Sequence, residues 1–153
     1  MFFSLIPEQQ NEIEKINLKV SENEMAFTFF DLIDGESTLI LDEEGHTILV
    51  NTGSIESEEE LDHYLTTYGI ENIDFLILTS DKDEYIGNSN WLLSSYEIKE
   101  IFLPESLKNT WDEVDLRIRF LEAGQTLELL KGLSITVLSD EINNHTGMDL
   151  LFR

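Results

Sequence analysis

The chain contains no cysteine. A disulfide framework and a thiolate metal site are therefore both excluded. Two other signatures of chemistry are missing as well. No Ser-His-Asp order is present, and Gly35, Gly45 and Gly53 are single turn residues that do not form a glycine-rich phosphate loop. The lack of cysteine is compatible with a reducing compartment, and we expect a cytoplasmic protein.

Basic residues are scarce. The sequence has 9 lysines and arginines against 32 aspartates and glutamates, which gives a formal net charge of −23. A surface of this sign repels phosphate backbones and anionic lipid headgroups, so binding to nucleic acid or to a membrane surface is disfavoured. The simplest role of so many acids is solubility.

Long apolar runs are also missing. The N-terminal MFFSLIP is apolar, but no basic region precedes it and Pro7-Glu8 ends it, so we expect neither a signal peptide nor a membrane span. The 153 residues, 41% of them hydrophobic, suit one domain over 1–153, in which 1–25 is the least readable part. Whether Arg153 is the natural C-terminus is left open.

The most informative stretch is Ile73–Asn90. Its first part, 73–78, is almost continuously apolar, which predicts a strand buried on both faces. A polar loop, 79–85, follows at once, and Asn88 then begins a group of helix N-cap candidates. In an open α/β sheet, sites form where strands end at their carboxyl edge, so this loop is the first place to look for chemistry.

The remaining elements are predicted from hydrophobic periodicity and turn residues. A three-strand meander covers 26–51, with a turn at Gly45. Ser57 and Glu60 form a capping box for a helix over 57–68, and a shorter helix covers 91–96. Further strands are predicted at 98–103, 116–121, 126–130 and 133–138, and a last one begins near Asp149. This order is typical of a layered α/β (α+β) domain.

Three segments resemble the metallo-β-lactamase superfamily, in particular its ComEC-like competence-protein branch. FFDLIDGESTLIL at 29–41 is similar to D-V-G-Q-G-D-x-x-L-I, and HTILVNTG at 46–53 to x-x-x-L-I-D-T-G. Thr79 and Gly87 frame a loop similar to T-H-x-H-x-D-H-x-G. The resemblance covers Ala26 to about Leu138. It implies a mixed sheet with helices on one face: a truncated half of an αββα sandwich, with its other face short of cover.

The ligand positions of that motif are altered. Ser80 and Lys82 stand where the first two histidines would be, Glu84 at the aspartate and Tyr85 at the last histidine. Serine is a poor zinc ligand, an ammonium repels a dication, and tyrosine ligates only as phenolate. Asn51 replaces the aspartate of D-T-G, without its charge. The resemblance thus implies a vestigial loop without catalytic residues or cofactor, as in a pseudoenzyme.

A weaker alternative is a divalent metal ion held through oxygen by Asp81, Asp83 and Glu84. Lys82 lies among these acids and opposes it. The histidines His46, His63 and His145 are widely separated, and we expect them at the surface rather than in a rebuilt zinc site.

Two functions remain open. The first is a metal-free domain with a binding or assembly role, and the second is a divergent metal-dependent hydrolase or nuclease. An uncovered sheet face would need a cover, which a homodimer, a protein partner or the N-terminal residues supply. We expect a dimer that tightens as salt relieves the repulsion between two charges of −23. The N-terminal candidates for the cover are Phe2, Phe3, Leu5 and Ile6.

Overall fold

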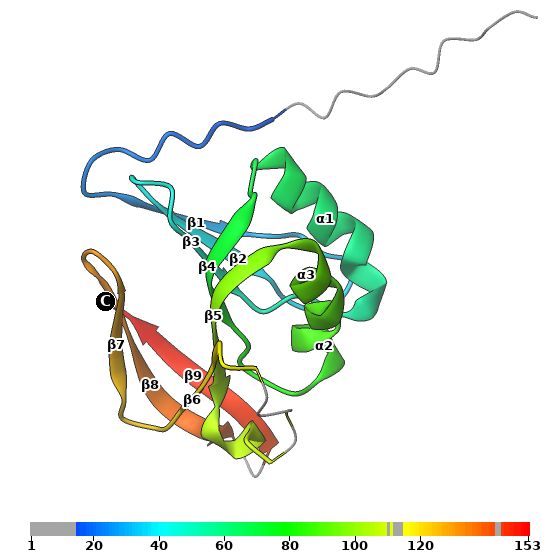
Figure 1. The fold of residues 1–153 in the computed structure, drawn as a ribbon, viewed down its shortest axis with the longest axis vertical. Coiled ribbons are helices and arrows are strands. Elements are labelled where there is room, and N and C mark those ends of the chain that lie inside the picture. The colour runs from blue at the N-terminus through cyan, green and yellow to red at the C-terminus, as the bar shows by residue number, and fades with distance from the viewer. Residues whose placement is uncertain (1–14, 110, 112–114, 143–144) are drawn as a thin grey trace, which may run out of the picture.

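The computed structural model describes residues 15–109, 111, 115–142 and 145–153. Its elements begin with three strands, continue with strands separated by short helices, and end in a run of strands (Figure 1). In chain order they are β1 Met25–Phe29, β2 Thr38–Asp42, β3 Thr47–Val50, η1 Ile55–Ser57, α1 Glu58–Thr67, β4 Asn72–Ile77, α2 Asp83–Ile86, α3 Ser89–Ser95, β5 Glu97–Pro104, η2 Glu105–Leu107, β6 Ile118–Leu121, β7 Thr126–Leu130, β8 Leu133–Ile142 and β9 His145–Phe152.

The larger sheet has six strands in the order β1-β2-β3-β4-β5-β6. β1, β2 and β3 form the predicted antiparallel meander, whereas β3, β4, β5 and β6 run parallel. The change from antiparallel to parallel pairing at β3 follows from the connections. A tight turn between β2 and β3 reverses the chain, whereas the crossover through α1 returns it so that β4 runs in the direction of β3. The carboxyl ends of β3 and β4 therefore lie side by side, and the candidate loop starts there.

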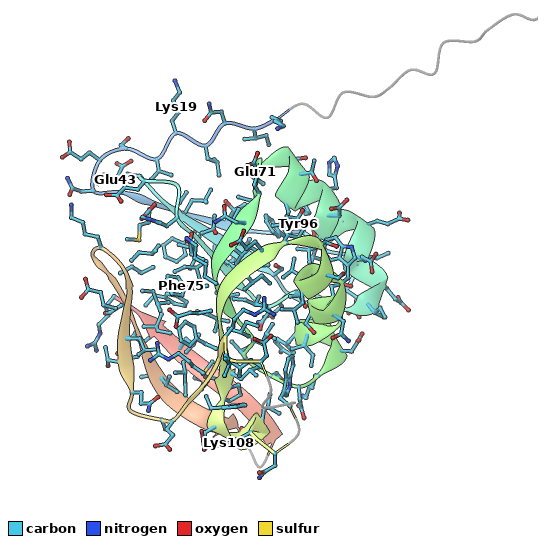
Figure 2. The ribbon with its side chains drawn as sticks, in the orientation of Figure 1. Lys19, Glu43, Glu71, Phe75, Tyr96 and Lys108 are labelled. Carbon is cyan, nitrogen blue, oxygen red and sulfur yellow. The ribbon has the colours of Figure 1, made fainter. Side chains whose placement is uncertain are left out.

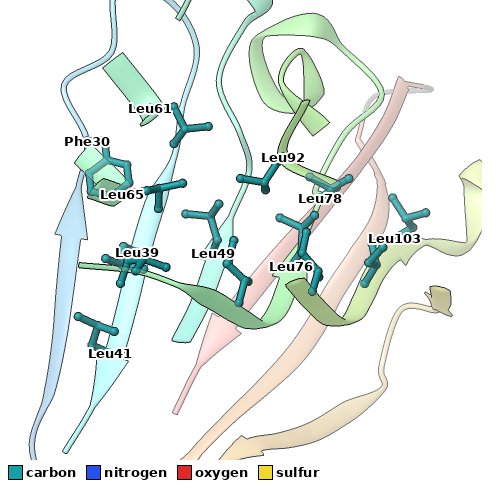
Figure 3. Close-up of a cluster of buried hydrophobic side chains, with 14 of the residues drawn as sticks. Phe30, Leu39, Leu41, Leu49, Leu61, Leu65, Leu76, Leu78, Leu92 and Leu103 are labelled. Atoms are coloured by element: carbon teal, nitrogen blue, oxygen red, sulfur yellow. The ribbon is translucent and has the colours of Figure 1, made fainter. Parts of the chain in front are cut away.

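The three α-helices cover one face of this sheet, as predicted for the two helices at 57–68 and 91–96, and α2 is an addition within the segment predicted as a loop (Figure 1). Leu61 and Leu65 of α1 and Leu92 of α3 are fully buried against strand residues such as Leu49 and Leu76 (Figure 3). The apolar stripe of α1 thus packs on the sheet as its spacing requires.

The other face is not short of cover, and that expectation is wrong. β7, β8 and β9 form a separate three-stranded antiparallel sheet that packs against it. Ile40, Ile77 and Phe102 of the large sheet are fully buried beneath Ile135 and its neighbours. Phe75 lies between the two sheets in Figure 2. The three layers are therefore the helices, the six-stranded sheet and the three-stranded sheet. The dimer was predicted from an uncovered sheet face, and that argument for it no longer applies.

The outer face of the small sheet is largely polar. Thr126 and Thr136 pair across β7 and β8 through hydroxyls 2.9 Å apart, and Glu128 and Asp149 are exposed. Its inward residues alternate with these, which is the pattern of a sheet that covers a core on one side and meets water on the other.

Two local predictions need comment. Ser57 does not cap α1, because its hydroxyl donates to the Asp34 carbonyl (2.6 Å) and accepts from the Asp34 N–H (3.1 Å). The capping-box prediction is therefore wrong, and a contact from outside the helix has replaced it. The predicted cover by residues 2–6 lies outside the described residues. Within those residues, no helix combines the length and apolar character that a membrane crossing requires.

Candidate functional site

Asn51 joins the ends of the two central parallel strands. Its N–H donates to the Ile77 carbonyl at 2.8 Å, which continues the β3–β4 ladder by one residue. Its backbone then turns into the left-handed region, with φ of 61°, a conformation that asparagine tolerates better than most residues. The turn directs the side chain across the strand ends, where Oδ1 accepts from the Thr79 N–H (2.9 Å) and hydroxyl (3.0 Å).

The loop after β4 is held mainly through its backbone. The Tyr85 carbonyl accepts from the Thr52 N–H at 2.7 Å, and the Glu84 carbonyl accepts from the Glu36 N–H at 2.9 Å. Gly35 allows the chain at Glu36 to come this close to Glu84, since a Cβ at position 35 would lie 2.2 Å from the Glu84 carbonyl oxygen. Residues 34–36, 51–55 and 79–87 thus form one hydrogen-bonded unit.

Asn88 locks the far end of this unit. Its amide donates to the carbonyls of Thr52 (2.9 Å) and Ser54 (2.7 Å), and the residue is 1% exposed. Sequence reasoning proposed it only as a helix cap, and it makes no capping hydrogen bond to α3. Gly87 precedes it because a Cβ there would lie 2.3 Å from the Ile55 nitrogen.

The side chains at the equated ligand positions differ in exposure. Ser80 is buried, whereas Lys82 and Glu84 are exposed and Tyr85 is half-buried. Among the described residues, no three histidine, aspartate or glutamate side chains are grouped in a way that holds a metal ion. A buried hydroxyl, an exposed ammonium and a phenol are poorly matched to zinc, and the Asn51 oxygen already accepts two hydrogen bonds.

A pocket of about 600 Å³ opens beside the loop, on the helix side of the sheet. Asp81 and Asp83 reach it, whereas Glu84, the third member of the alternative metal set, does not line it. Asp115 supplies a third carboxylate, but it accepts from the Arg117 guanidinium at 2.6–3.2 Å, which holds its pKa below the usual range. Sequence reasoning missed Asp115, because only the fold brings the segment before β6 to the same pocket as Asp81 and Asp83.

The small sheet closes the other side of the loop. The Met148 N–H of β9 donates to the Thr79 carbonyl at 2.6 Å, and the Met148 side chain is 4% exposed. The end of β4 is therefore enclosed by Asn51 on one side and by β9 on the other. Ser80, the next residue, is buried in consequence.

A separate charged cluster lies at the opposite end of the strands. His46 Nδ1 is 2.8 Å from Asp42 Oδ2, and Asp74 pairs with Lys99. The hydrogen bond with Asp42 raises the pKa of His46, although burial opposes it. Burial favours the protonated form of Asp42, but hydrogen bonds from the His46 side chain and backbone outweigh it, so the pKa of Asp42 is lowered.

Among the described side chains, the histidines belong to no group that could hold a metal ion. His46 is tied to Asp42, and His63 is exposed on α1, where its ring lies 6.2 Å from that of Tyr64. The side chain of His145 lies outside the description.

No family model matches the chain, and no curated protein sequence matches it. Its fold does have counterparts among solved structures. A chemotaxis sensor, ODP, described with a peroxy diiron species, superposes with a TM-score of 0.68 at 13% identity, over 85% of this chain and 56% of that one. The subclass B3 metallo-β-lactamase MEM-A1, isolated from a soil metagenome library, gives 0.66 at 13% identity, over 84% and 54%.

The chain has the metallo-β-lactamase fold. A rubredoxin oxygen:oxidoreductase from Desulfovibrio gigas agrees, with a TM-score of 0.69 at 18% identity, over 82% of this chain and 36% of that one. The chain spans about half the length of the first two structures. At these identities the likeness concerns the metallo-β-lactamase fold and not the chemistry performed on it.

Proposed function

We propose that this domain is a metal-free pseudoenzyme with the metallo-β-lactamase fold, acting through binding or assembly. The observation that carries the proposal is the junction at Asn51. Its amide oxygen accepts from both the N–H and the hydroxyl of Thr79, so the group equated with the family's aspartate serves the loop itself. The neighbouring positions, Ser80 and Lys82, supply a buried hydroxyl and an exposed ammonium. This set stabilises a loop and offers no basis for activating a water molecule.

The ComEC-like branch is the finer part of this proposal. It is supported by the order of the segments 29–41, 46–53 and 79–87. Backbone hydrogen bonds between residues 36 and 84 and between 52 and 85 tie these three segments together. The proposal concerns residues 1–153 only. The partner is a protein, since a net charge of −23 opposes nucleic acid.

Metal analysis of protein purified without chelator tests the proposal. We expect far less than one zinc or manganese ion per chain, and no micromolar zinc binding in calorimetry. Stoichiometric metal that is lost in Glu84→Ala but kept in Glu59→Ala would overturn it. Glu59 suits the control because it is an exposed acid in the first turn of α1.

Lys82→His sharpens the test. Restoring one imidazole should not create zinc binding, because serine and tyrosine still occupy the flanking ligand positions. Tight zinc binding by this variant alone would show that the loop retains a nearly complete ligand set.

A second candidate function is a divergent metal-dependent hydrolase or nuclease. The observation in its favour is that Asp81 and Asp83 both line the 600 Å³ pocket, where Asp115 adds a carboxylate. Hydrolysis of bis(p-nitrophenyl) phosphate with added Mn²⁺, abolished in Asp81→Asn and Asp83→Asn, would favour it. Activity that persists in both variants would indicate a contaminant.

A further inference from the structure

Half of the backbone groups of β1 point away from the protein. The Phe30 N–H donates to the Ser37 carbonyl at 3.0 Å, which makes these two residues a hydrogen-bonded pair. Hydrogen-bonded pairs alternate along an antiparallel ladder, and Thr28↔Leu39 is the next one in register. The N–H and C=O groups of the intervening residues, Phe27 and Phe29, therefore face outward at the edge of the six-stranded sheet.

These outward groups have no hydrogen-bond partner within the described ranges. The side chains of the same two residues are unusually open as well, since Phe27 is 43% and Phe29 77% exposed. Phe27 rests edge-on against Phe152 of β9, with ring centroids 6.1 Å apart, so the apolar strip continues onto the second sheet. Large exposed apolar residues beside an open strand edge are typical of an interaction surface.

β1 also lacks the features that protect strand edges. It contains no charged residue and no proline, and its register with β2 is unbroken by a bulge. The opposite edge strand, β6, carries Arg119 in an ion pair with Glu100. β9 uses its Met148 N–H to bind Thr79. Among these three edge strands, only β1 is both apolar and unprotected.

We propose that β1 binds an extended segment of a partner protein as an added strand, with apolar residues at alternate positions and basic residues at both ends. Charge identifies this occupant. Glu22 and Glu24 precede β1, Asp31 and Asp34 follow it, and all four are exposed. Glu43 adds a carboxylate beside the N-terminal end of β1, where it accepts a hydrogen bond from the Asn23 N–H (Figure 2).

A second copy of the chain is the less suitable occupant. Antiparallel pairing of β1 with itself would bring the acids before one strand against the acids after the other, and each chain carries −23. A basic segment gains from the same charges. This proposal rests on the binding role proposed above, because it names the surface and the kind of partner for that role. The exposed edge of β1 does not itself depend on whether the protein binds metal.

Amide hydrogen exchange by NMR tests the pairing directly. The probe is a synthetic amidated peptide, Lys-Lys-Thr-Val-Thr-Val-Thr-Lys-Lys. In the free protein the Phe27 and Phe29 amides should exchange quickly, whereas the Thr28 and Phe30 amides should be protected by β2. On binding the peptide, Phe27 and Phe29 should become at least about tenfold more protected, since their N–H groups acquire acceptors. A peptide with glutamate in place of lysine should bind at least about tenfold more weakly.

Two matched variants separate backbone pairing from apolar contact. Phe27→Ala and Phe27→Pro both remove the ring, but only proline removes the outward N–H, and neither removes a bond to β2. Peptide affinity should fall moderately in the first and be lost in the second. Phe29→Ala and Phe29→Pro repeat the comparison at the strand end, where proline disturbs folding least. Equal affinity of the alanine and proline variants would overturn the proposal.

Other outcomes are equally decisive. Protection of Phe27 and Phe29 in the free protein that grows with concentration would assign the edge to a second copy, and protection independent of concentration would assign it to the chain itself. Both would overturn the proposal. Metal content of the same sample separates the two ideas. If a zinc-loaded protein binds the peptide, the binding surface at β1 is supported and the pseudoenzyme proposal is overturned. If metal-free protein does not bind the peptide, the binding surface is overturned and the pseudoenzyme proposal stands.

Discussion

Asn51 performs two tasks that few residues combine. It adopts a positive φ at the end of β3, and its side chain then accepts from the loop that follows β4. Aspartate, which the resemblance places at this position, has the same shape but would carry a charge at a site only 5% exposed. An amide therefore suits a buried position where the acceptor oxygen receives two hydrogen bonds from the loop.

Substitution of Asn51 should separate these tasks. Asn51→Gly keeps the backbone conformation and loses the acceptor, so the free energy of unfolding should fall by about 1–3 kcal/mol for the unsatisfied Thr79 N–H. Asn51→Ala adds left-handed strain and should cost about 1–2 kcal/mol more. Urea denaturation measures both. If alanine proves no worse than glycine, the positive φ is not retained in solution.

His46 should make stability depend on pH near neutrality. Its pKa is raised above the ordinary value of 6.5 by the hydrogen bond to Asp42. A raised folded-state pKa adds stability that is complete below the unfolded value and is lost as pH rises through the folded value. The unfolding free energy should therefore fall as pH rises from below the ordinary value to above the raised folded-state pKa, by less than about 1 kcal/mol because the imidazole is 45% exposed.

His46→Gln should reduce this fall, whereas His63→Gln should preserve it, since His63 forms no ion pair in the described structure. Urea denaturation midpoints of the unchanged protein and of the two variants, measured at the lower and upper ends of this pH range, supply the comparison. An unchanged pH dependence in His46→Gln would place its origin elsewhere in the chain.

At the scale of the elements, local patterns predicted more than the assembly did. The continuous apolar run at 73–78 indicated a strand buried on both faces, and β4 is one. The strands at 126–130 and 133–138 were also predicted, but not their place in a second sheet. Alternation shows which side of a strand is buried, and it does not show against what. The uncovered face was inferred from the resemblance to half of an αββα sandwich, although residues that cover it, such as Ile135 and Val137, are in the sequence.

The candidate site shows the same limit. Position 79–87 after a buried strand located the loop, because strand ends meet at one sheet edge. Two sets of contacts were not predictable from spacing, since each spans more than 20 residues. They are the hydrogen bonds of Ser57 to Asp34 and the two hydrogen bonds of the Asn88 amide to the 52–54 backbone. Local motifs such as the capping box compete with such contacts, and here the distant contact prevailed.

Two neighbours on β4 test the three-layer arrangement. Leu76 faces the helices and Ile77 faces the small sheet, and both are fully buried. Leu76→Ala and Ile77→Ala should each lower the unfolding free energy by about 2–5 kcal/mol. Ile33→Ala, at a residue 71% exposed, should change it by less than about 0.5 kcal/mol. A cost for Ile77→Ala as small as that of the control would mean that the small sheet does not cover this face in solution.

For the whole molecule the dominant feature is charge. Each of four basic residues pairs with a carboxylate: Lys99, Lys108, Arg117 and Arg119. Arg119 also lies 5.3 Å from the Phe102 ring centroid. The 32 acidic residues nonetheless outnumber the 9 basic ones more than threefold, so there are too few bases to give each carboxylate its own partner. Their mutual repulsion opposes the compact state and favours a cationic partner, which links the folding energetics to the proposed use of β1.

Stability should consequently rise with salt. Screening shortens the Debye length from about 30 Å at 10 mM to about 8 Å at 150 mM, which removes most of the repulsion between distant carboxylates. The same ions weaken the exposed pairs, but those contribute at most about 1 kcal/mol each. Urea, an uncharged denaturant, leaves the ionic strength free to vary, so its midpoint should increase over this range of NaCl and then level off. Sedimentation under the same conditions shows whether a dimer forms. A midpoint that rises while the protein stays monomeric assigns the effect to repulsion within one chain, whereas a midpoint that falls would mean that the local ion pairs outweigh the net charge of −23.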